Sequence, residues 1–473
     1  MKFFPSPSTF ESLSLLHGHR FKWRLLLVVG VGTFAGVLST SSFNVAITSL
    51  SRDFGIGQEL AQWTMTGFMV AMTLSMLPAP WLLDHLGFRR LFLMAVMTLT
   101  LTSVAGSLAS SFTAVVFIRI LQGVATGVLQ PMGTLLVMRL FPPASQGRAI
   151  GILTLGLVLA PAVAPAFGGV LVDHFGWQAI FLLNLPFCLV AGLLGLYWLP
   201  LPREVVRRRF DWLGVSLLSL VTLTLVEGVS SLQHSGLKAW WTVAQFLVAL
   251  ALTGVFTWHA RRSPAPIINI ELFAHRSFTM GSLVSFTYGF GLFGSTYLIP
   301  VFLQKALGYS ATAAGLVLFP GGIALAFTTP LAGRMADRYS PKYITMGGLV
   351  LFGLSFLMFA VLGGHIDGKE LFTATVMGRI GLGLILPALS LATLRHLDTQ
   401  HLAQSSSVVS YMRQLGGVLG IAVIAVFVQW RESIYGSATP GIFSAYSQGF
   451  MVLSMVVLLA VLAAASMKTN RVD

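Results

Sequence analysis

Long uninterrupted apolar stretches recur along the whole sequence, and they constrain its fold more than any other feature. A helix needs about 20 mostly apolar residues to cross the hydrocarbon core of a bilayer. Of the 473 residues, 55% are hydrophobic and only 9% are charged, whereas a soluble domain carries about 25% charged residues. The sequence therefore predicts an all-α integral membrane protein. It excludes an ordinary cytosolic enzyme, a disordered chain and a secreted disulfide scaffold.

Fourteen stretches are long enough to be membrane spans. They are continuous, whereas a membrane β-barrel would show alternating segments of about ten residues, so a barrel is excluded as well. The predicted spans are residues 25–50, 62–83, 90–110, 113–138, 147–172, 177–199, 211–231, 239–260, 277–303, 311–334, 342–363, 371–394, 403–430 and 444–466.

The basic residues predict the orientation of these spans. Lys and Arg concentrate in the cytoplasmic loops of membrane proteins. With the N-terminus inside, the inner segments hold twenty-one of the 29 basic residues and the outer segments hold five. Both termini are therefore expected in the cytoplasm, and the net charge of +14 needs no nucleic-acid partner. The three basic residues left inside spans are Arg119, Arg379 and Arg413.

An internal repeat divides the chain into two halves. The segment from Phe112 to Gly123 recurs from Phe372 to Gly383, with Phe-Thr-Ala at the start and Arg-Ile inside. A second pair, Asp84 followed by Arg89 and Arg90, and Asp337-Arg338 followed by Lys342, lies on cytoplasmic loops. Such parallel repeats of six helices occur in transporters. We expect six-helix halves at 25–200 and 271–466, a linker at 201–270 with two extra helices, and tails at 1–24 and 467–473.

Several motifs together resemble a known family. The loop reads Pro80-Trp81-Leu82-Leu83-Asp84-His85-Leu86-Gly87-Phe88-Arg89-Arg90, and the second half has Gly333-Arg334-Met335-Ala336-Asp337-Arg338. Further motifs are Arg119-Ile120-Leu121-Gln122-Gly123, Ala160-Pro161-Ala162-Val163-Ala164-Pro165-Ala166-Phe167-Gly168-Gly169, Phe210-Asp211-Trp212-Leu213-Gly214 and Arg413-Gln414-Leu415-Gly416-Gly417. In this order they resemble the major facilitator superfamily, and within it the fourteen-helix drug:proton antiporters of the EmrB/QacA type.

One position departs from that family. Its first helix usually carries an aspartate before an N-V-A sequence, whereas this chain has Ser39 there, ahead of Asn44-Val45-Ala46. In the family this acid is a candidate proton or cation site. Its absence puts the usual coupling in doubt and leaves open which group replaces it.

The resemblance implies a multi-pass exporter in the inner membrane of a bacterium. Its expected substrates are hydrophobic or amphipathic small molecules, moved by alternating access with proton antiport, in contact with membrane lipid. A periplasmic adaptor and an outer-membrane channel are open as partners, and nothing requires more than a monomer. The chain has no nucleotide-binding loop of the G-x-x-x-x-G-K-[ST] kind. Two alternatives remain: a dedicated exporter of an endogenous metabolite, siderophore or lipid, and a transport-dead membrane sensor.

The repeated cytoplasmic loops supply candidate gating residues. We expect Asp84 to pair with Arg89 or Arg90 and Asp337 with Arg338, and these pairs to close the cytoplasmic side. The alternative is a solvated surface pair that contributes well under about 1 kcal/mol.

The arginines inside spans are the sharpest candidates for coupling or cavity residues. An intramembrane arginine costs at least about 2.5–3.5 kcal/mol, so it should face the interior and have a partner. For Arg119 we expect Gln122, Ser39, Ser41 or Asn44 as partners; the alternative is that it reaches the outer interface. Arg379 is its repeat mate and Arg413 lies deep. With no acid at a span centre, the cavity is expected to favour neutral or anionic substrates.

The remaining candidates carry weaker signals. Glu227 is either a coupling acid or an interfacial residue of an extra helix. Pro161, Pro165, Gly168 and Gly169 are expected to kink a helix and to seal an interface between the halves. No His, Cys, Asp or Glu pattern predicts a metal site or another cofactor, and the single cysteine is Cys188. An apolar substrate pocket is predicted from Trp63, Met65, Phe68, Tyr288, Phe290, Phe293, Tyr297 and Tyr411.

Overall fold

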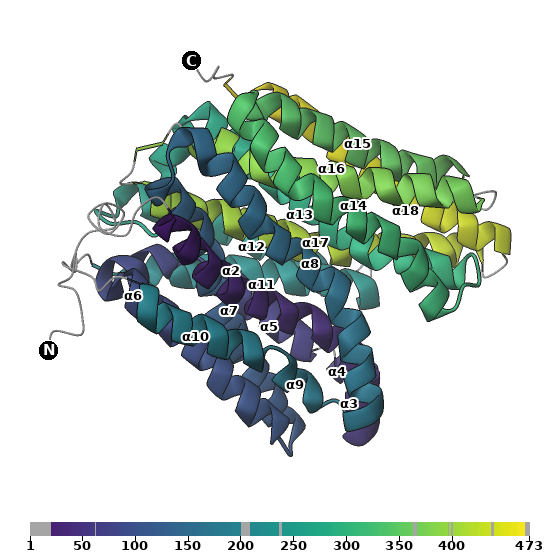
Figure 1. Ribbon diagram of the computed structural model, residues 1–473. Coiled ribbons are helices and arrows are strands. Elements are labelled where there is room, and N and C mark those ends of the chain that lie inside the picture. The colour runs from purple at the N-terminus through teal and green to yellow at the C-terminus, as the bar shows by residue number, and fades with distance from the viewer. Residues whose placement is uncertain are drawn as a thin grey trace, which may run out of the picture.

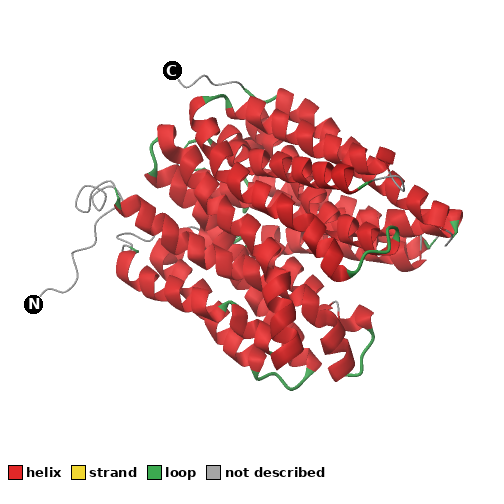
Figure 2. Ribbon diagram, turned by 45° about the vertical axis from the view of Figure 1, so that its right-hand side comes forward, coloured by secondary structure: helices red, strands yellow, loops and turns green. Residues whose placement is uncertain are grey.

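The computed structural model describes residues 20–61, 63–199, 209–235, 239–362, 367–395, 397–398, 401–436 and 439–468, and all regular structure in them is helical (Figure 2). The helices are α2 (Phe21–Ser42), η1 (Phe43–Ala46), α3 (Ile47–Asp53), α4 (Gln58–Ala61), α5 (Trp63–Ser75), α6 (Ala79–Ser107), α7 (Phe112–Leu140), α8 (Pro143–Phe175), α9 (Ala179–Leu183), α10 (Leu185–Trp198), α11 (Trp212–Ser235), α12 (Trp240–Arg262), η2 (Ile270–Ala274), α13 (Arg276–Lys305), α14 (Ala311–Arg338), α15 (Pro341–Leu362), α16 (Gly368–Leu394), α17 (Leu402–Tyr435) and α18 (Thr439–Ala465).

Twelve helices within the described residues are long and apolar enough to cross a membrane. The other two predicted spans, 62–83 and 147–172, fall on α5 with the start of α6 and on the 33-residue α8. The all-helical membrane fold is therefore confirmed. The count of fourteen spans is consistent with the structure and stays a prediction.

Three predicted boundaries differ from the structure. The stretch 25–50 is divided into α2, η1 and α3, and the stretch 177–199 is divided at Asn184 between α9 and α10. The motif loop 84–90 contains no long turn, because a single residue, Gly87, breaks α6 with φ 75° and ψ 161°. Only glycine adopts this backbone region readily, so one residue suffices to reverse the chain between two helices.

The helices form two groups with a pair of helices beside them (Figure 1). In the first group α2 packs on α7, α8 and α10, and α5 and α6 pack on α7; in the second, α13 packs on α17 and α18, and α16 packs on α14 and α15. The helices α11 and α12 pack on each other, and α11 also contacts α17. The predicted repeat lies on α7 and α16. It extends to the following helices, because α8 and α17 both end at a glycine with φ 80°, Gly176 and Gly436.

The two groups meet at one end of the molecule, which we call the terminal end. It holds the start of α2 and the end of α18, where the Lys468 backbone N–H donates to Ser277 Oγ at 3.0 Å. At the opposite, far end the groups diverge (Figures 1 and 2). All hydrogen bonds described between the groups join residues 130–148 of the first to residues 337–413 of the second.

Backbone contact between α8 and α14 makes this junction tight. A Cβ atom on Gly147 would lie 2.2 Å from the Gly333 carbonyl oxygen, and one on Gly333 would lie 2.2 Å from the Gly147 oxygen. Gly151 is similarly close to Thr329. Small residues let two helix backbones approach in this way, so any larger side chain here forces the groups apart.

The break at Gly87 gives the first prediction. Gly87→Ala should lower the free energy of unfolding by about 1–3 kcal/mol, because alanine is strained in this backbone region. The measurement is thermal unfolding of the purified protein in detergent. Gly347→Ala is the control, since a Cβ there meets nothing within 4 Å and the backbone is helical. Equal melting temperatures for Gly87→Ala and the control would contradict the assignment.

Candidate functional site

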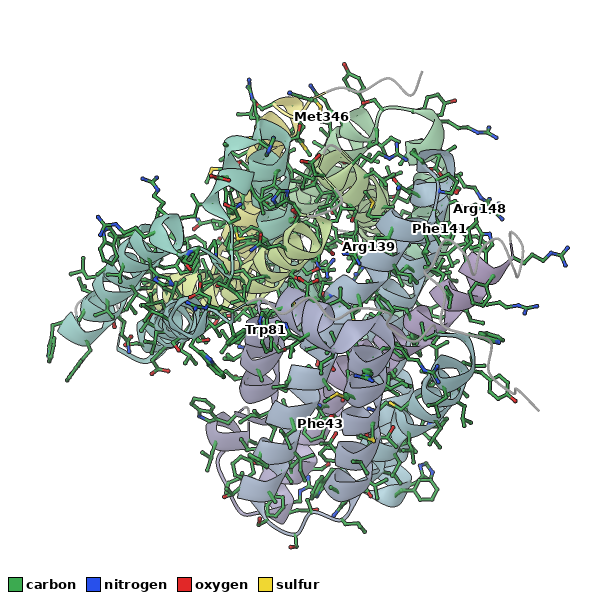
Figure 3. All side chains as sticks on the ribbon, turned by 90° about the vertical axis from the view of Figure 1, so that its left-hand side faces the viewer. Phe43, Trp81, Arg139, Phe141, Arg148 and Met346 are labelled. Carbon is green, nitrogen blue, oxygen red and sulfur yellow. The ribbon has the colours of Figure 1, made fainter. Side chains whose placement is uncertain are left out.

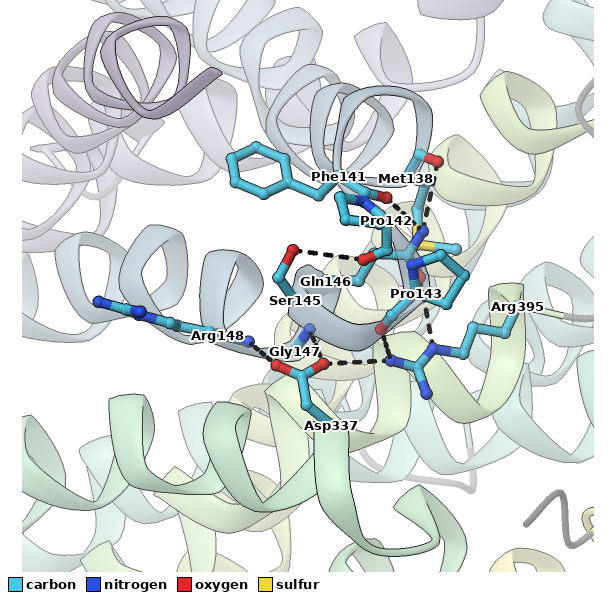
Figure 4. Close-up of polar contacts among 10 residues, drawn as sticks. All are labelled: Met138, Phe141, Pro142, Pro143, Ser145, Gln146, Gly147, Arg148, Asp337 and Arg395. Carbon is cyan, nitrogen blue, oxygen red and sulfur yellow. Dashed lines mark hydrogen bonds and ion pairs between the residues drawn. The ribbon is translucent and has the colours of Figure 1, made fainter. Parts of the chain in front are cut away.

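Asp337 lies at the centre of the polar contacts that join the two groups at the terminal end (Figure 4). Its Oδ1 accepts from the Gly147 N–H at 2.7 Å, and its Oδ2 accepts from the Arg148 N–H at 2.8 Å. Arg395 Nη2 donates to the same Oδ1 at 3.2 Å and to the Pro143 carbonyl at 2.6 Å. Helix N-termini favour negative charge. A carboxylate from α14 therefore holds the first turns of α8, in the other group.

Arg338 is not the partner of Asp337, contrary to the sequence prediction. Its side chain is exposed at the end of α14, while Asp337 and Arg395 are 8% and 14% exposed. Neighbouring residues on a helix do not face each other, so Arg338 points away when Asp337 faces α8. The acid of this loop therefore pairs with Arg395, and the gating role of the loop stays a prediction.

The loop in the first half has a related arrangement. Arg89 donates to the Leu196 carbonyl of α10 at 2.7 Å, and Arg90 is exposed. Asp84 acts electrostatically on Arg139, in the last turn of α7, and its pairing with Arg89 or Arg90 stays a prediction. Arg139 occupies the end of α7 as Arg395 caps the end of α16. In each half the acid of the loop thus interacts with an arginine at the end of the helix that carries the repeated segment, α7 in the first and α16 in the second. Figure 3 shows Arg139 where the groups meet.

Sequence reasoning missed Gly147, Arg139 and Arg395. A signal existed for the first, because Gly147-Arg148-Ala149-Ile150-Gly151 is a small-xxx-small pattern of the kind that joins membrane helices. The two arginines were counted only as inner charges, since nothing local in the sequence connects them to acids more than fifty residues away.

Arg119 is fully buried inside the first group. Figure 3 labels Phe43, whose ring lies beside its guanidinium. Its Nη1 donates to the Ser39 carbonyl, to Ser39 Oγ and to Gln122 Oε1 at 3.2, 3.1 and 3.0 Å. Its Nε donates to the Thr64 carbonyl at 3.2 Å. The guanidinium carbon also lies 4.4 and 4.1 Å from the ring centres of Phe43 and Phe68. Ser39 and Gln122 are thus confirmed as its partners; the Asn44 side chain lies outside the described part of the chain.

A buried polar network extends from this arginine. Gln122 Nε2 donates to Ser103 Oγ at 3.3 Å, and Ser103 Oγ donates to Asn184 Oδ1 at 3.2 Å. The network joins α2, α5, α6, α7 and the junction of α9 with α10. No salt bridge to Arg119 is formed by any carboxylate among the described residues, and its Nη2 is buried without a partner. Neutral oxygens and aromatic faces stabilise the cation where the family has an acid.

A second cationic group lies between α13, α16 and α17. Tyr288 is fully buried, and both Arg379 and Arg413 are near enough to act on it electrostatically. Arg413 Nη2 also reaches the first group and donates to Gln130 Oε1 of α7 at 2.9 Å. Both arginines are partly exposed although they lie in the interior of long helices.

Close helix packing positions Arg413 beside Tyr288. A Cβ on Gly289 would lie 1.9 Å from the Arg413 carbonyl oxygen, and one on Gly416 would lie 2.0 Å from the Phe286 oxygen. The glycines of the Arg413–Gly417 motif therefore let α17 contact the backbone of α13. The same device operates in the first group, where Gly123 and Gly127 of α7 approach the backbone of α5.

The residues predicted for an apolar pocket do not come together. Phe68 lies under Arg119, Phe290 is 7% exposed in the core of the second group, and Phe293 packs on Gly417. Trp63 and Tyr297 are 52% and 37% exposed, and Met65 is partly buried. Tyr411 turns to the extra helices, because its buried hydroxyl needs a partner and finds Thr222 Oγ1 at 2.8 Å. Only Tyr288 remains at a polar site between helices.

Two further predictions concern other helices. Glu227 is exposed on α11, so it is not part of a buried coupling site. The helix α8 is continuous across positions 161–169, and the predicted kink there stays a prediction; the side chains of Pro161 and Pro165 lie outside the described part, and Gly168 and Gly169 are buried and partly buried. The described contacts of α8 with the other group include Gly147, Gly151 and Val158.

The extra helices are fixed by Asp211. This residue accepts hydrogen bonds from the Gly214 and Ile267 N–H groups at 2.9 and 3.0 Å, and its Oδ1 lies 2.7 Å from His259 Nε2. It thereby joins the start of α11 to the end of α12. Among the described residues no three His, Cys, Asp or Glu side chains gather as a metal site.

Comparison with known proteins agrees with this fold. The family model described as Major Facilitator Superfamily matches residues 29–421 and 281–466. The chain belongs to the major facilitator superfamily. The human organic anion transporter MFSD10 (TETRAN) has a TM-score of 0.66 at 16% identity, over 94% of this chain and 99% of that one. The proton:xylose symporter XylE has a TM-score of 0.66 at 12% identity, over 93% and 94%. These two likenesses support the fold alone.

Relatives by sequence place the chain with the EmrB type. It is 31% identical over 414 residues to the multidrug resistance protein B homolog of Mycobacterium tuberculosis (strain ATCC 25618 / H37Rv), covering 86% of this chain and 77% of the relative. It is 29% identical to the multidrug export protein EmrB of Escherichia coli (strain K12), over 87% and 81%. The lincomycin resistance protein LmrB of Bacillus subtilis (strain 168) is 26% identical over 95% of both chains. The protein is thus a multi-pass membrane transporter of this superfamily.

The α8–α14 contact predicts how one glycine controls the terminal end. In Gly333→Val the side chain meets the Gly147 oxygen, so the groups should separate there. The probe is a cysteine in place of Ser406, whose hydroxyl donates to the Pro131 carbonyl between the two groups. In the Gly333→Val background this cysteine should react with a polar maleimide at least about tenfold faster than in the background with Gly333. A tenfold change corresponds to about 1.4 kcal/mol in the opening equilibrium. Gly347→Val is the control. An unchanged labelling rate in Gly333→Val would show that this contact does not hold the end closed.

The Arg119 network predicts the effect of restoring an acid. Ser39→Asp should raise the melting temperature, because a carboxylate beside the guanidinium gains a charge-assisted hydrogen bond. In an Arg119→Met background the same substitution should lower it, since the buried carboxylate is then unpaired. The double-mutant cycle should give a coupling energy of about 1–3 kcal/mol. A coupling energy near zero would mean that position 39 does not contact Arg119 in the membrane protein.

Proposed function

We propose that this transporter exports hydrophobic or amphipathic small molecules across the inner membrane of a bacterium, by alternating access driven by proton antiport. The observation that carries the proposal is the one-sided junction of the two groups, which share their described hydrogen bonds at the terminal end and diverge at the far end. The printed functions of its relatives, multidrug resistance and multidrug export, support efflux.

The direction follows from the charges. Most described basic residues lie at the terminal end, among them Arg90, Arg148, Arg334 and Lys342, and the far end holds few, such as Lys369 and Arg431. By the positive-inside rule the terminal end is cytoplasmic. The structure is then the outward-facing state, closed to the cytoplasm by Asp337 and the α8–α14 contact. Transport requires this end to open and the far end to close.

The proposal divides the chain into halves at 25–200 and 271–466, with residues 201–270 supplying α11, α12 and their connections, and short tails at 1–24 and 467–473. The helix 1 position holds Ser39, so proton coupling falls to another group. Asp337 is the acid that bonds across the junction of the halves, and it pairs with Arg395. Asp84 acts electrostatically on Arg139 within the first half. Protonation of Asp337 removes a charge that holds the terminal end.

Proteoliposomes that contain a pH-sensitive dye test the proposal. With a proton gradient imposed, adding a cationic, neutral or anionic amphiphile should produce proton flux that depends on both the compound and the protein. Asp337→Asn should reduce this flux at least about tenfold, because it weakens an inter-half contact that is worth more than about 1.4 kcal/mol if buried and charged. Gln304→Ala, on an exposed side chain at the far end of α13, is the control.

If the Asp337→Asn variant shows the same proton flux as the wild type, the proposed role of the junction is overturned. An absence of flux with every compound, in protein that binds at least one of them, would overturn proton antiport and would favour a sensor or a transporter that uses another ion.

A further inference from the structure

Two arginines in the second group carry positive charge that the protein itself does not neutralise. Arg379 of α16 and Arg413 of α17 both act electrostatically on Tyr288 of α13, and both keep part of their surface exposed. Among the described residues, Arg379 makes no hydrogen bond and Arg413 bonds only to the neutral amide of Gln130. An intramembrane arginine costs at least about 2.5–3.5 kcal/mol and marks a functional site by default.

The acids on the surrounding helices are engaged elsewhere. Asp337 of α14 is bound to α8 at the terminal end, and Glu370 of α16 forms a capping box with Asp367 at the far end. Glu432, near the far end of α17, acts on Tyr446 of α18. No described carboxylate on α13, α14, α16 or α17 therefore faces the two guanidinium groups.

Comparison with Arg119 shows what these arginines lack. Arg119 and Arg379 occupy the same place in the repeat, but Arg119 is followed three residues later by Gln122 and Arg379 by Leu382. Gln122 Oε1 accepts a hydrogen bond from Arg119 at 3.0 Å, whereas the buried Leu382 offers Arg379 no acceptor. Arg119 is fully enclosed, and its Nε and Nη1 donate to neighbouring oxygens while its Nη2 has no partner. Arg379 is partly exposed and has no hydrogen-bond partner among the described residues.

We propose that Arg379 and Arg413 bind the anionic group of an amphipathic substrate, such as a carboxylate or sulfonate on an apolar body. Guanidinium groups pair well with planar or branched oxyanions. This inference rests on the proposed export function and names its substrate class.

Binding at this site also affects the contact between the halves. The hydrogen bond from Arg413 to Gln130 crosses from the second group to the first. An oxyanion that binds the Nη2 of Arg413 competes with the amide of Gln130 and is the stronger acceptor. Occupancy of Nη2 therefore weakens one of the contacts that hold the two groups together.

A matched pair of probes tests the substrate class: dansyl-labelled undecanoic acid, which is anionic at neutral pH, and its uncharged undecanamide. Binding to the full chain in lipid nanodiscs is read from energy transfer between tryptophan and dansyl, with empty nanodiscs as the blank. The acid should bind at least about tenfold more tightly than the amide. Arg413→Gln and Arg379→Gln should each remove most of this difference and leave the affinity for the amide within about twofold.

Three further variants separate charge from structure. Arg413→Lys should keep much of the preference for the acid, because it keeps the charge. Leu382→Gln should weaken binding of the acid, because it gives Arg379 the acceptor that Gln122 gives Arg119. Arg431→Gln, on the same helix as Arg413 but partly exposed near the far end, should change neither affinity.

Equal affinity for the acid and the amide in the wild type would overturn the proposal. So would a parallel loss of both affinities in the Gln variants when Arg413→Lys behaves in the same way, because the arginines would then be structural. These outcomes differ from failure of the export proposal, in which no compound produces flux in proteoliposomes. A protein that exports only neutral or cationic compounds would retain its function and lose this inference.

Discussion

The contact of α14 with the first turns of α8 is the interaction on which the state of the whole molecule depends. Two helix backbones touch at Gly147 and Gly333, and one carboxylate, Asp337, accepts hydrogen bonds from two backbone N–H groups of the opposite half. Neither half can rotate away without exposing that carboxylate and its partners together. The far end has no comparable contact among the described residues. The contact between α8 and α14 therefore explains why the two groups meet at the terminal end and diverge at the other.

Glycine also determines where the charges lie inside each half. Gly123 and Gly127 bring α7 onto α5, which places Arg119 over the ring of Phe68. Gly289 and Gly416 bring α13 onto α17, which places Arg413 beside Tyr288. In a membrane the association of helices depends on close packing more than on exclusion of water. In the motifs that combine Arg with Gly, the glycine therefore allows the two helices to touch, and this contact positions the arginine side chain.

The sequence predicted the helices far better than the side-chain contacts between them. Apolar length located the spans, and the repeat correctly equated α7 with α16, because both signals are local in the chain. It also gave Ser39 and Gln122 as neighbours of Arg119, since a buried cation needs the nearest polar groups. The pairing of Asp337 with Arg395 and the turn of Tyr411 toward Thr222 were missed, because they depend on which face each helix presents after packing. A hydrophobic pocket could not be predicted from composition when nearly every residue is apolar.

The two halves have kept the same scaffold and have come to treat the same arginine differently. Arg119 and Arg379 stand at equivalent places, yet one is enclosed by Ser39, Thr64, Gln122 and two aromatic rings and the other is partly exposed. A cation whose Nε and Nη1 donate to oxygens on several helices fixes the positions of those helices. A partly exposed cation without an acceptor is tolerable in a membrane where water reaches it. The difference between Gln122 and Leu382 therefore gives Arg119 an acceptor three residues along its own helix and gives Arg379 none at the equivalent place.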